Sequence, residues 1–328
     1  MVNLLAFMKP GTGKHAGIAL LSAVAVFLAA NGIEGIVLRF VKPSEQQLTW
    51  VSDAVIAVGL AAAIYFWLDL QATRVSLSRL EHEQIAVETE LSLAAEIQRS
   101  HLPKVPSAGS GLSWAARLRQ ARKIGGDFYD FVQVDSQRWL AILGDVSGKG
   151  IPAALLVASV QTLFRGLSQR MDQPAELLRT LSKAIYDETK GSMFVTCVLG
   201  LFDLERRTLT YANAGHPPGL IVNDSRMTLL KSAGTPLGLF ASWNYDAVTI
   251  PLREGDIGVL ITDGVSESIE TNGISWCELA RTALVDIERP TAEQVCERLM
   301  KMAQDGLGPA GVADWEDDQT TLVFLVGC

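Results

Sequence analysis

The longest apolar runs of the chain lie near its amino-terminal end. Residues 16–33 contain no charged side chain, and 18 residues of helix reach about 27 Å, close to the roughly 30 Å thickness of a bilayer's hydrocarbon core. A second run, residues 50–68, has Trp50 at one end, aromatic residues at the other, and only Asp53 as a charge. The pattern predicts two membrane spans, at about 16–38 and 50–68, that form a hairpin within residues 1–69.

Basic residues flank this hairpin and suggest its orientation. Lys9 and Lys14 precede the first run, and Arg74 and Arg79 follow the second. Because basic residues concentrate on the cytoplasmic side, we expect both ends of the hairpin, and the rest of the chain, in the cytoplasm at the inner membrane. A cleaved signal peptide is the alternative for the first run, but no small-residue cleavage site follows it.

Residues 70–105 form the next predicted segment, a helical linker. Between residues 70 and 101 there is no glycine or proline, and a seven-residue frame produces two columns of mainly apolar residues. The columns are Leu70, Leu77, Gln84, Leu91 and Gln98, and Thr73, Leu80, Val87, Ala94 and His101. This frame predicts a parallel coiled coil, and hence a homodimer; the alternative is an amphipathic helix packed on the following domain. Pro103 and Pro106 end the helix.

Residues 106–328 show the pattern of a separate α+β domain. Short β-prone runs are interspersed with a few amphipathic helical patterns, without a regular alternation of the two. Predicted strands are 112–119, 128–133, 139–145, 194–203, 208–213, 219–222, 257–262 and 320–326; predicted helices are 152–169, 174–189, 276–287 and 292–304. Thr291 to Gln294 resembles a capping box, and Glu205 to Arg207 a hairpin loop. The pattern predicts a layered sandwich with antiparallel strands.

Composition excludes several classes of function. The net charge of −8 provides no field suited to nucleic acid, whose binding depends on neutralising phosphates with Lys and Arg. The four cysteines are far apart, with no CxxC pair and no histidine at ligand spacing. We therefore expect reduced, structural cysteines and neither a disulfide framework nor a zinc site.

Four acidic motifs lie where predicted strands meet loops. They contain Asp127 after two glycines, Asp145 in GDVSGKG, Asp263 in TDG, and Asp317 in DDQT. A single aspartate of this kind is commonly a turn residue, but four need a joint explanation. If the fold gathers them, their repulsion requires cations, and oxygen ligands in that number favour Mg²⁺ or Mn²⁺.

The ordered motifs of this domain resemble a known family. The set GGDFYDF, GDVSGKGIPAAL, YANAGHPPG, GTPLG, TDGVSES and DDQTTLVFL is similar to the SpoIIE-type bacterial branch of the PPM (protein phosphatase 2C-like) phosphatases. The resemblance covers about residues 112–326, and the preceding EIQRSHLP is similar to the linker found upstream in that branch. It implies an αββα sandwich and a metal-dependent protein serine/threonine phosphatase.

The same resemblance implies a centre of two Mn²⁺ or Mg²⁺ ions. Asp127 and Asp145 would face both ions and hold the bridging water that attacks phosphorus, while the Val146 carbonyl, Asp263 and Asp317 complete the ligand shell. Asp317 matches as the first acid of its pair, with Asp318 as the alternative. The implied substrate is a phosphoserine or phosphothreonine on a regulatory protein, typically a STAS-type anti-sigma-factor antagonist.

Several neighbouring residues carry no clear role in this chemistry. Lys149 does not belong to a Walker loop. Such a loop has four residues between its first glycine and Gly-Lys, followed by Ser or Thr, whereas here three residues separate Gly144 from Gly148 and Gly150 follows Lys149. We interpret Asn213 and His216 as structural. Eukaryotic relatives hold the substrate phosphate with an arginine, but none of those near the first aspartate can be matched to it: Arg117, Arg119 and Arg122.

Two other functions compete with the phosphatase. A diguanylate cyclase is suggested by Gly125 to Phe128, which resembles the GGDEF signature, but the second acidic residue is missing and the later motifs would be unexplained. A catalytically silent sensor or scaffold of the same fold is the other alternative, although all the expected ligands are present. For regulation, we hypothesise that signals at the hairpin change the packing of residues 70–101 and so shift the helices after Asp145.

Overall fold

The computed structural model describes residue 32 and residues 45–106, 111–223, 226–231, 233–270, 274–285, 290–306 and 317–327. The chain divides into two compact units, Met1–Glu88 and Thr89–Cys328, which we describe separately. Apart from residue 32, the predicted first membrane span lies outside the described residues.

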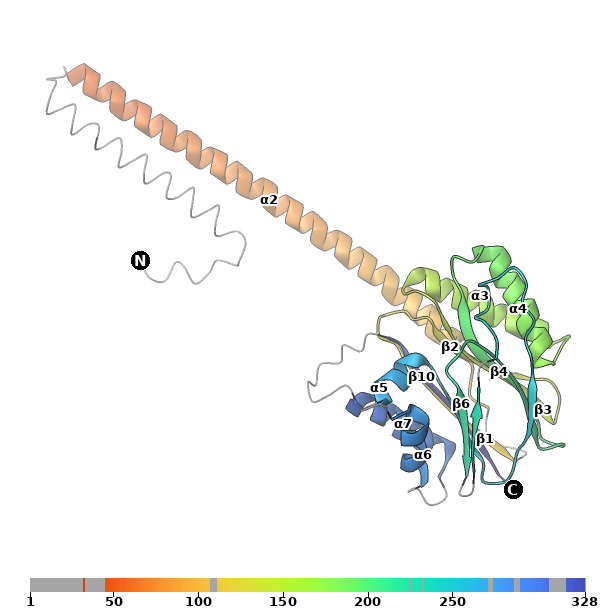
Figure 1. The fold of residues 1–328 in the computed structure, drawn as a ribbon. Coiled ribbons are helices and arrows are strands. Elements are labelled where there is room, and N and C mark those ends of the chain that lie inside the picture. The colour runs from red at the N-terminus through yellow and green to blue at the C-terminus, as the bar shows by residue number, and fades with distance from the viewer. Residues whose placement is uncertain are drawn as a thin grey trace. The chain divides into compact units, whose positions relative to one another are not determined.

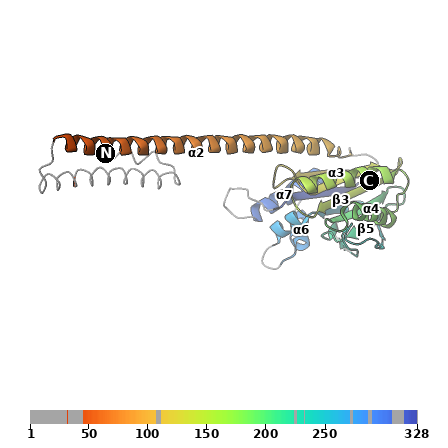
Figure 2. The same ribbon diagram turned by 90° about the horizontal axis from the view of Figure 1, so that it is seen from above.

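Helix α2 (Glu45–His101) runs without interruption through the predicted second span and the predicted linker (Figure 2). Part of it is long and apolar enough to cross a membrane, and its apolar window is entirely exposed. Helix α3 (Ile151–Ser168) passes the same test, but it buries one face in the core of the second unit. The predicted boundaries at residues 69 and 105 stay predictions.

The heptad columns of α2 change character along the helix. Leu77, Leu80 and Val87 are at least half exposed, whereas Leu91 and Ala94 are partly buried. The last turns of the helix, which belong to the second unit, therefore pack on the domain, as the alternative to a coiled coil predicted. The coiled coil stays a prediction for the exposed part.

Two five-stranded antiparallel sheets form the centre of the second unit. The first sheet has the order β1 (Leu112–Arg119), β10 (Gln319–Val326), β9 (Ile257–Ile261), β6 (Gly219–Asn223) and β7 (Arg226–Leu230). The second has the order β2 (Asp127–Gln133), β3 (Arg138–Val146), β4 (Val195–Asp203), β5 (Thr208–Ala214) and β8 (Val248–Pro251). The last strand of the chain thus lies between β1 and β9.

Helices cover both outer faces of this sandwich (Figure 1). Helices α3 and α4 (Pro174–Thr189) pack on the second sheet, whereas α5 (Asp263–Ile269), α6 (Trp276–Val285) and α7 (Ala292–Gly306) pack on the first. Strand β4 shows why the layers form: its alternate side chains point to opposite faces, with Leu199 toward the helices and Phe202 between the sheets. The predicted αββα sandwich is confirmed.

Aromatic side chains fill the space between the two sheets. The rings of Trp114 and Phe202 meet edge to face with centroids 4.7 Å apart, and Phe202 contacts Phe324 in the same way at 4.8 Å. Such pairs add about 0.5–1.5 kcal/mol each beyond the burial of their area. This packing fixes the two sheets against each other, so residues contributed by different sheets keep a defined separation.

The predicted elements of the domain are confirmed with small shifts of their ends. The capping box at α7 forms as expected, because Thr291 Oγ1 accepts from the Gln294 backbone at 3.2 Å and Gln294 Oε1 accepts from the Thr291 backbone at 3.0 Å. Three short elements were missed: β7, β8 and α5. The helix α5 has only seven residues, too few for its periodicity to be recognised, and it begins at Asp263 itself.

Candidate metal centre

Asp127 and Asp145 lie directly opposite each other on the paired strands β2 and β3. The adjoining backbone approaches closely, because Val146 N donates to the Gly126 carbonyl at 3.1 Å. A Cβ on Gly126 would lie 2.8 Å from Val146 O and 3.1 Å from Asp145 Oδ1. Glycine is therefore required where the two acidic strand ends meet.

Asp127 is buried and takes hydrogen bonds from the other sheet. Its Oδ2 accepts from Thr262 Oγ1 at 2.8 Å and from Thr320 Oγ1 at 2.6 Å. Burial raises its pKa well above the usual value, the nearby Asp145 charge raises it further, and the two hydroxyls oppose the rise. Asp127 is thus a carboxylate whose charge the surrounding protein only partly stabilises.

Asp145 is half-buried and is surrounded by other carboxylates. Burial is the largest cause that raises its pKa to about 7, followed by the charges of Asp263, Asp317 and Asp318. These groups come from β3, from the start of α5 and from the segment before β10. The fold therefore gathers the aspartates of all four sequence motifs into one electrostatically coupled cluster.

Asp263 begins α5 immediately after β9. Its Oδ1 accepts a hydrogen bond from the Gly264 backbone at 2.8 Å. Burial first, and then the charge of Asp317, raises its pKa. A Cβ on Gly264 would lie 2.1 Å from the Asp318 carbonyl oxygen, so the α5 start and the acidic pair are in direct backbone contact.

The two adjacent acids Asp317 and Asp318 have different surroundings. Asp318 is buried, and its carboxylate accepts backbone hydrogen bonds from Ala121 at 2.8 Å and from Gly126 at 2.7 Å, with a longer one from Asp127 at 3.5 Å. The side chain of Asp317 is half exposed, and its Oδ2 lies 3.4 Å from Lys149 Nζ. The Asp318 carboxylate thus accepts from several backbone N–H groups, whereas Asp317 accepts from one, Asp318 N, at 3.0 Å through Oδ1.

Lys149 lies in a loop with unusual backbone geometry. The flanking Gly148 and Gly150 have φ angles of 89° and 82°, which favour glycine. The Lys149 ammonium and the Asp317 carboxylate are each about half exposed, so their pairing contributes little stability. Lys149 therefore places a positive charge beside the acidic cluster.

The donor set fits a hard divalent cation. It consists of carboxylates, with the Val146 carbonyl beside the Gly126 backbone, and contains no nitrogen or sulfur ligand. Within the ranges the structure describes, no three acidic, histidine or cysteine side chains converge on one ion. Mg²⁺ is commonly bound by one or two protein carboxylates and several water molecules. The opposed carboxylates of Asp127 and Asp145 are enough for such a site.

Asn213 and His216 are buried, and His216 Nδ1 lies 3.0 Å from Thr196 Oγ1. Asn213 Oδ1 accepts from the His216 backbone at 2.8 Å, and its amide donates to the His216 carbonyl at 3.2 Å. Burial lowers the pKa of His216 to about 3, so its ring is neutral at ordinary pH. These contacts show that Asn213 and His216 stabilise a turn.

Arg117, one of the three arginines considered for phosphate binding, pairs with Glu293 of α7.

Sequence reasoning missed the residues that support the cluster. Thr262 immediately precedes Asp263 and Thr320 lies two residues after Asp318, so their place within TDG and DDQTT was an available signal. Gln98 near the end of α2 donates from Nε2 to the Gly125 carbonyl at 2.8 Å, and Gly125 N donates to its Oε1 at 3.2 Å. Gln98 lies in the EIQRSHLP segment that resembles the family's linker, but the sequence does not show that its partner is Gly125.

The two stacked sheets, flanked by helices and carrying an acidic cluster that both sheets support, define a PPM-type protein serine/threonine phosphatase. The chain belongs to the stage II sporulation protein E (SpoIIE) family, whose profile matches residues 135–326. This membership removes the diguanylate cyclase alternative, since the Gly125–Phe128 motif lies at the start of a strand in the phosphatase fold.

Individual relatives agree with this assignment. The chain is 30% identical over 247 residues to phosphoserine phosphatase RsbU of Bacillus subtilis (strain 168), covering 74% of this chain and 71% of RsbU. The SiaA-PP2C domain of Pseudomonas aeruginosa matches with a TM-score of 0.62 at 22% identity, covering 74% of this chain and 98% of that domain. RsbX in complex with magnesium matches with a TM-score of 0.52 at 14% identity, covering 67% and 98%. The two structures share the fold.

Proposed function

We propose that the chain is a membrane-anchored, metal-dependent phosphatase that removes phosphate from serine or threonine of a regulatory protein. The observation that carries the proposal is the placement of Asp127 opposite Asp145 within a larger group of carboxylates. Such a cluster is unfavourable unless cations neutralise it. The magnesium bound by RsbX, a protein of the same fold, supports this requirement.

In the proposed centre, two Mn²⁺ or Mg²⁺ ions are held by this chain's own oxygen atoms. Asp127 and Asp145 would contact both ions, and the Val146 carbonyl, Asp263 and Asp317 would complete the protein ligands. The surroundings of the acidic pair favour Asp317, because the Asp318 carboxylate is already occupied by backbone N–H groups. When bound, the metal would lower the pKa of a water molecule and neutralise charge on the phosphate.

Neighbouring side chains orient Asp127, and the cysteines of the described residues are poorly suited to act as nucleophiles. Thr262 and Thr320 hold one oxygen of Asp127, which leaves the other available to a cation. Within the described residues, the free cysteines are buried, and burial raises the pKa of the Cys197 thiol. An activated nucleophilic cysteine requires a lowered pKa, so direct attack by water on phosphorus is the consistent mechanism.

The proposed substrate and membrane location are based on the relatives and on the sequence of α2. RsbU is a phosphoserine phosphatase, and the family resemblance points to a STAS-type protein as the phosphorylated partner in a partner-switching pathway. The apolar part of α2 supports an anchor that contacts lipid in the inner membrane, with the catalytic domain in the cytoplasm. The exposed heptad columns of α2 support a homodimer through the linker.

The test is phosphate release from a phosphorylated STAS-domain protein by the full chain in detergent, with Mn²⁺ or Mg²⁺ added after chelation. We expect metal-dependent release that Asp127→Asn reduces by at least about a hundredfold, in line with the loss of a group that stabilises the transition state. Asp246→Asn, at an exposed position, is the control. Release that does not depend on metal, or that survives Asp127→Asn, would contradict the proposal. Binding without release would support the silent scaffold instead.

A further inference from the structure

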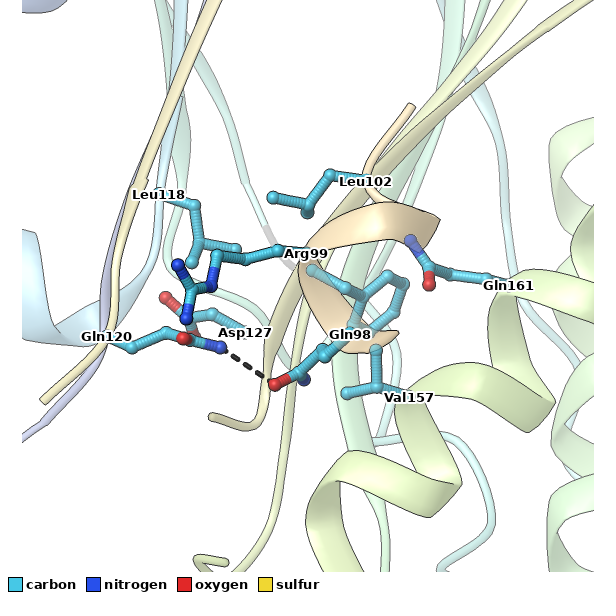
Figure 3. A pocket seen from close by; sticks show the side chains of 9 residues that line it. Gln98, Arg99, Leu102, Leu118, Gln120, Asp127, Val157 and Gln161 are labelled. Carbon is cyan, nitrogen blue, oxygen red and sulfur yellow. Dashed lines mark hydrogen bonds between the residues drawn. The ribbon is translucent and has the colours of Figure 1, made fainter. Parts of the chain in front are cut away.

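The carboxyl-terminal turns of α2 contact the loop that carries Asp127. Gln98 uses both ends of its side-chain amide on one residue: Nε2 donates to the Gly125 carbonyl and Oε1 accepts from the Gly125 N–H, at 2.8 and 3.2 Å. Gln120 also donates to Gln98 Oε1, at 2.8 Å (Figure 3). The amide thus satisfies the donor and the acceptor of one peptide backbone at the same time.

The same loop is held from its other side by Asp318. That carboxylate accepts from Gly126 N at 2.7 Å, one residue beyond the contact of Gln98. A Cβ on Gly125 would lie only 2.0 Å from Asp318 Oδ2, so the loop is in close contact with this side chain. Two side chains, from α2 and from the segment before β10, therefore fix the backbone that leads into Asp127.

The α2 end also forms part of the wall of a small pocket next to the cluster. Gln98, Arg99 and Leu102 line this pocket together with Asp127 and with Gln161 of α3 (Figure 3). The position of the helix end is therefore directly related to the surroundings of the first metal ligand.

Polar contacts hold these turns on the domain. Arg165 of α3 donates to the His101 carbonyl at 3.1 Å and pairs with Asp130 of β2 at 2.7 Å, and Lys123 donates to Ser92 at 3.0 Å. Intramolecular hydrogen bonds of this kind contribute about 0.5–1.5 kcal/mol each. Together with the buried Ala95 and the packing of Leu102 on the core, these contacts define how the helix end sits on the domain.

We propose that Gln98 is a positioning residue for the phosphatase centre, which holds Asp127 in its metal-binding position only while the end of α2 is docked. The inference rests on the proposed function, since it assigns a purpose to Asp127. Undocking the helix would leave the Gly125 backbone without this partner and allow the loop to move. A movement of α2 would then be transmitted to the metal site through the loop before Asp127.

The test compares Gln98→Met with Gln84→Met in the full-length protein in detergent. Methionine preserves side-chain length and helix propensity but loses both hydrogen bonds. Gln84 belongs to the same heptad column and is exposed, so its substitution is the matched control. Gln98→Glu keeps an acceptor for the Gly125 N–H and loses the donor, which separates the two bonds.

The first readout is hydrogen exchange of a peptide that covers Gly125 to Phe128, measured without metal or substrate. We expect exchange about tenfold faster in Gln98→Met and unchanged in Gln84→Met, the effect of losing roughly one net hydrogen bond. The second is Mn²⁺ affinity by calorimetry, which we expect to fall five- to tenfold in Gln98→Met and by a smaller factor in Gln98→Glu.

Wild-type exchange of the loop together with wild-type Mn²⁺ affinity in Gln98→Met would overturn the inference. Equal effects of Gln84→Met would also overturn it, because they would come from the helix in general. The exchange measurement does not depend on catalysis. A wild-type protein that fails to release phosphate would therefore refute the proposed function, while the role of Gln98 in holding the loop would still be decided by exchange.

Discussion

Asp127 and Asp145 occupy directly opposed positions on β2 and β3, and the pKa of each is raised partly by nearby carboxylates. Antiparallel pairing normally disfavours like charges at opposed positions. The chain keeps the arrangement and adds further acids from α5 and from the segment before β10. The metal-free centre is therefore a source of instability that a cation would relieve.

The stability of the metal-free protein should decrease as pH rises. The pKa of Asp145 is raised to about 7 in the folded state from an ordinary value of 3.8, so the folded state binds more protons between these values. This favourable contribution is complete below about pH 4 and is lost as pH rises through about 7. In EDTA, Asp145→Asn should remove part of this slope and raise the melting temperature at pH 8 by a few degrees, measured by thermal unfolding. An unchanged pH slope in the variant would contradict the assignment.

Cation binding should release protons at mildly acidic pH. Because the carboxylates have raised pKa values and a metal binds their ionised forms, binding at pH 6 should displace about one proton, and fewer at pH 8. Calorimetric titration with Mn²⁺ in buffers of different ionisation enthalpy measures this number. A proton count that stays the same between pH 6 and pH 8 would argue against a metal site at these aspartates.

Asp317 and Asp318 should respond differently to the same substitution. Asp318→Ala leaves buried backbone N–H groups without an acceptor, so we expect a loss of about 3 kcal/mol or more in the free energy of unfolding. Asp317→Ala should change that free energy by less than about 0.5 kcal/mol, since its pairing with Lys149 is half exposed. It should instead weaken Mn²⁺ binding. Denaturant unfolding and metal titration of both variants provide the comparison, and the reverse pattern would make Asp318 the ligand.

Glycines beside the acidic cluster should not tolerate a methyl group. A Cβ on Gly264 would lie 2.1 Å from the Asp318 carbonyl oxygen, a backbone atom that cannot turn aside. We expect Gly264→Ala to destabilise the domain by about 2–3 kcal/mol or more and to weaken metal binding. The control is Gly166→Ala in α3, where no atom lies within 4 Å and helix propensity should add about 0.5–1 kcal/mol. Equal stability of the two variants would show that the contact at Gly264 can relax.

The hydroxyl of Thr320 should matter more than its size. Thr320→Val keeps the shape and removes the 2.6 Å hydrogen bond to Asp127 Oδ2, one of the contacts that lower the Asp127 pKa. We expect the Asp127 pKa to rise and Mn²⁺ affinity at pH 6 to fall about three- to tenfold, with a smaller effect at pH 8. Thr320→Ser, which retains the hydroxyl, should restore most of the affinity. If serine and valine behave alike, the hydrogen bond is not the cause.

The sequence alone was sufficient for the fold class, and it identified the acidic motifs that the fold brings near Asp145. Strand β4 was predictable because its residues are mostly apolar, and three of the acidic motifs were recognisable because a glycine neighbours the aspartate. The short elements were not predictable: β8 has four residues, and its exposed Val248 gives no alternating pattern. Local periodicity fails for elements whose stability comes from tertiary contacts.

The different roles of Asp317 and Asp318 also could not be predicted from the sequence. Both are acids in the same motif, and only the path of the chain shows that residues 121 and 126 direct their N–H groups at the second one. The same holds for Gln98, whose partner Gly125 is 27 residues away. Contacts between distant segments decide these roles, and a single sequence does not specify them.

Strand β10 is the last of the chain and lies in the interior of its sheet, and Thr320 within it supports Asp127 from the other sheet. A ribosome that is still translating this region has therefore produced a chain whose first sheet lacks a central member. The acidic centre has no complete scaffold until β10 itself has left the exit tunnel. A chain truncated before β10 should therefore bind Mn²⁺ poorly and release little phosphate, because it lacks both a central strand and the hydrogen bond from Thr320 to Asp127.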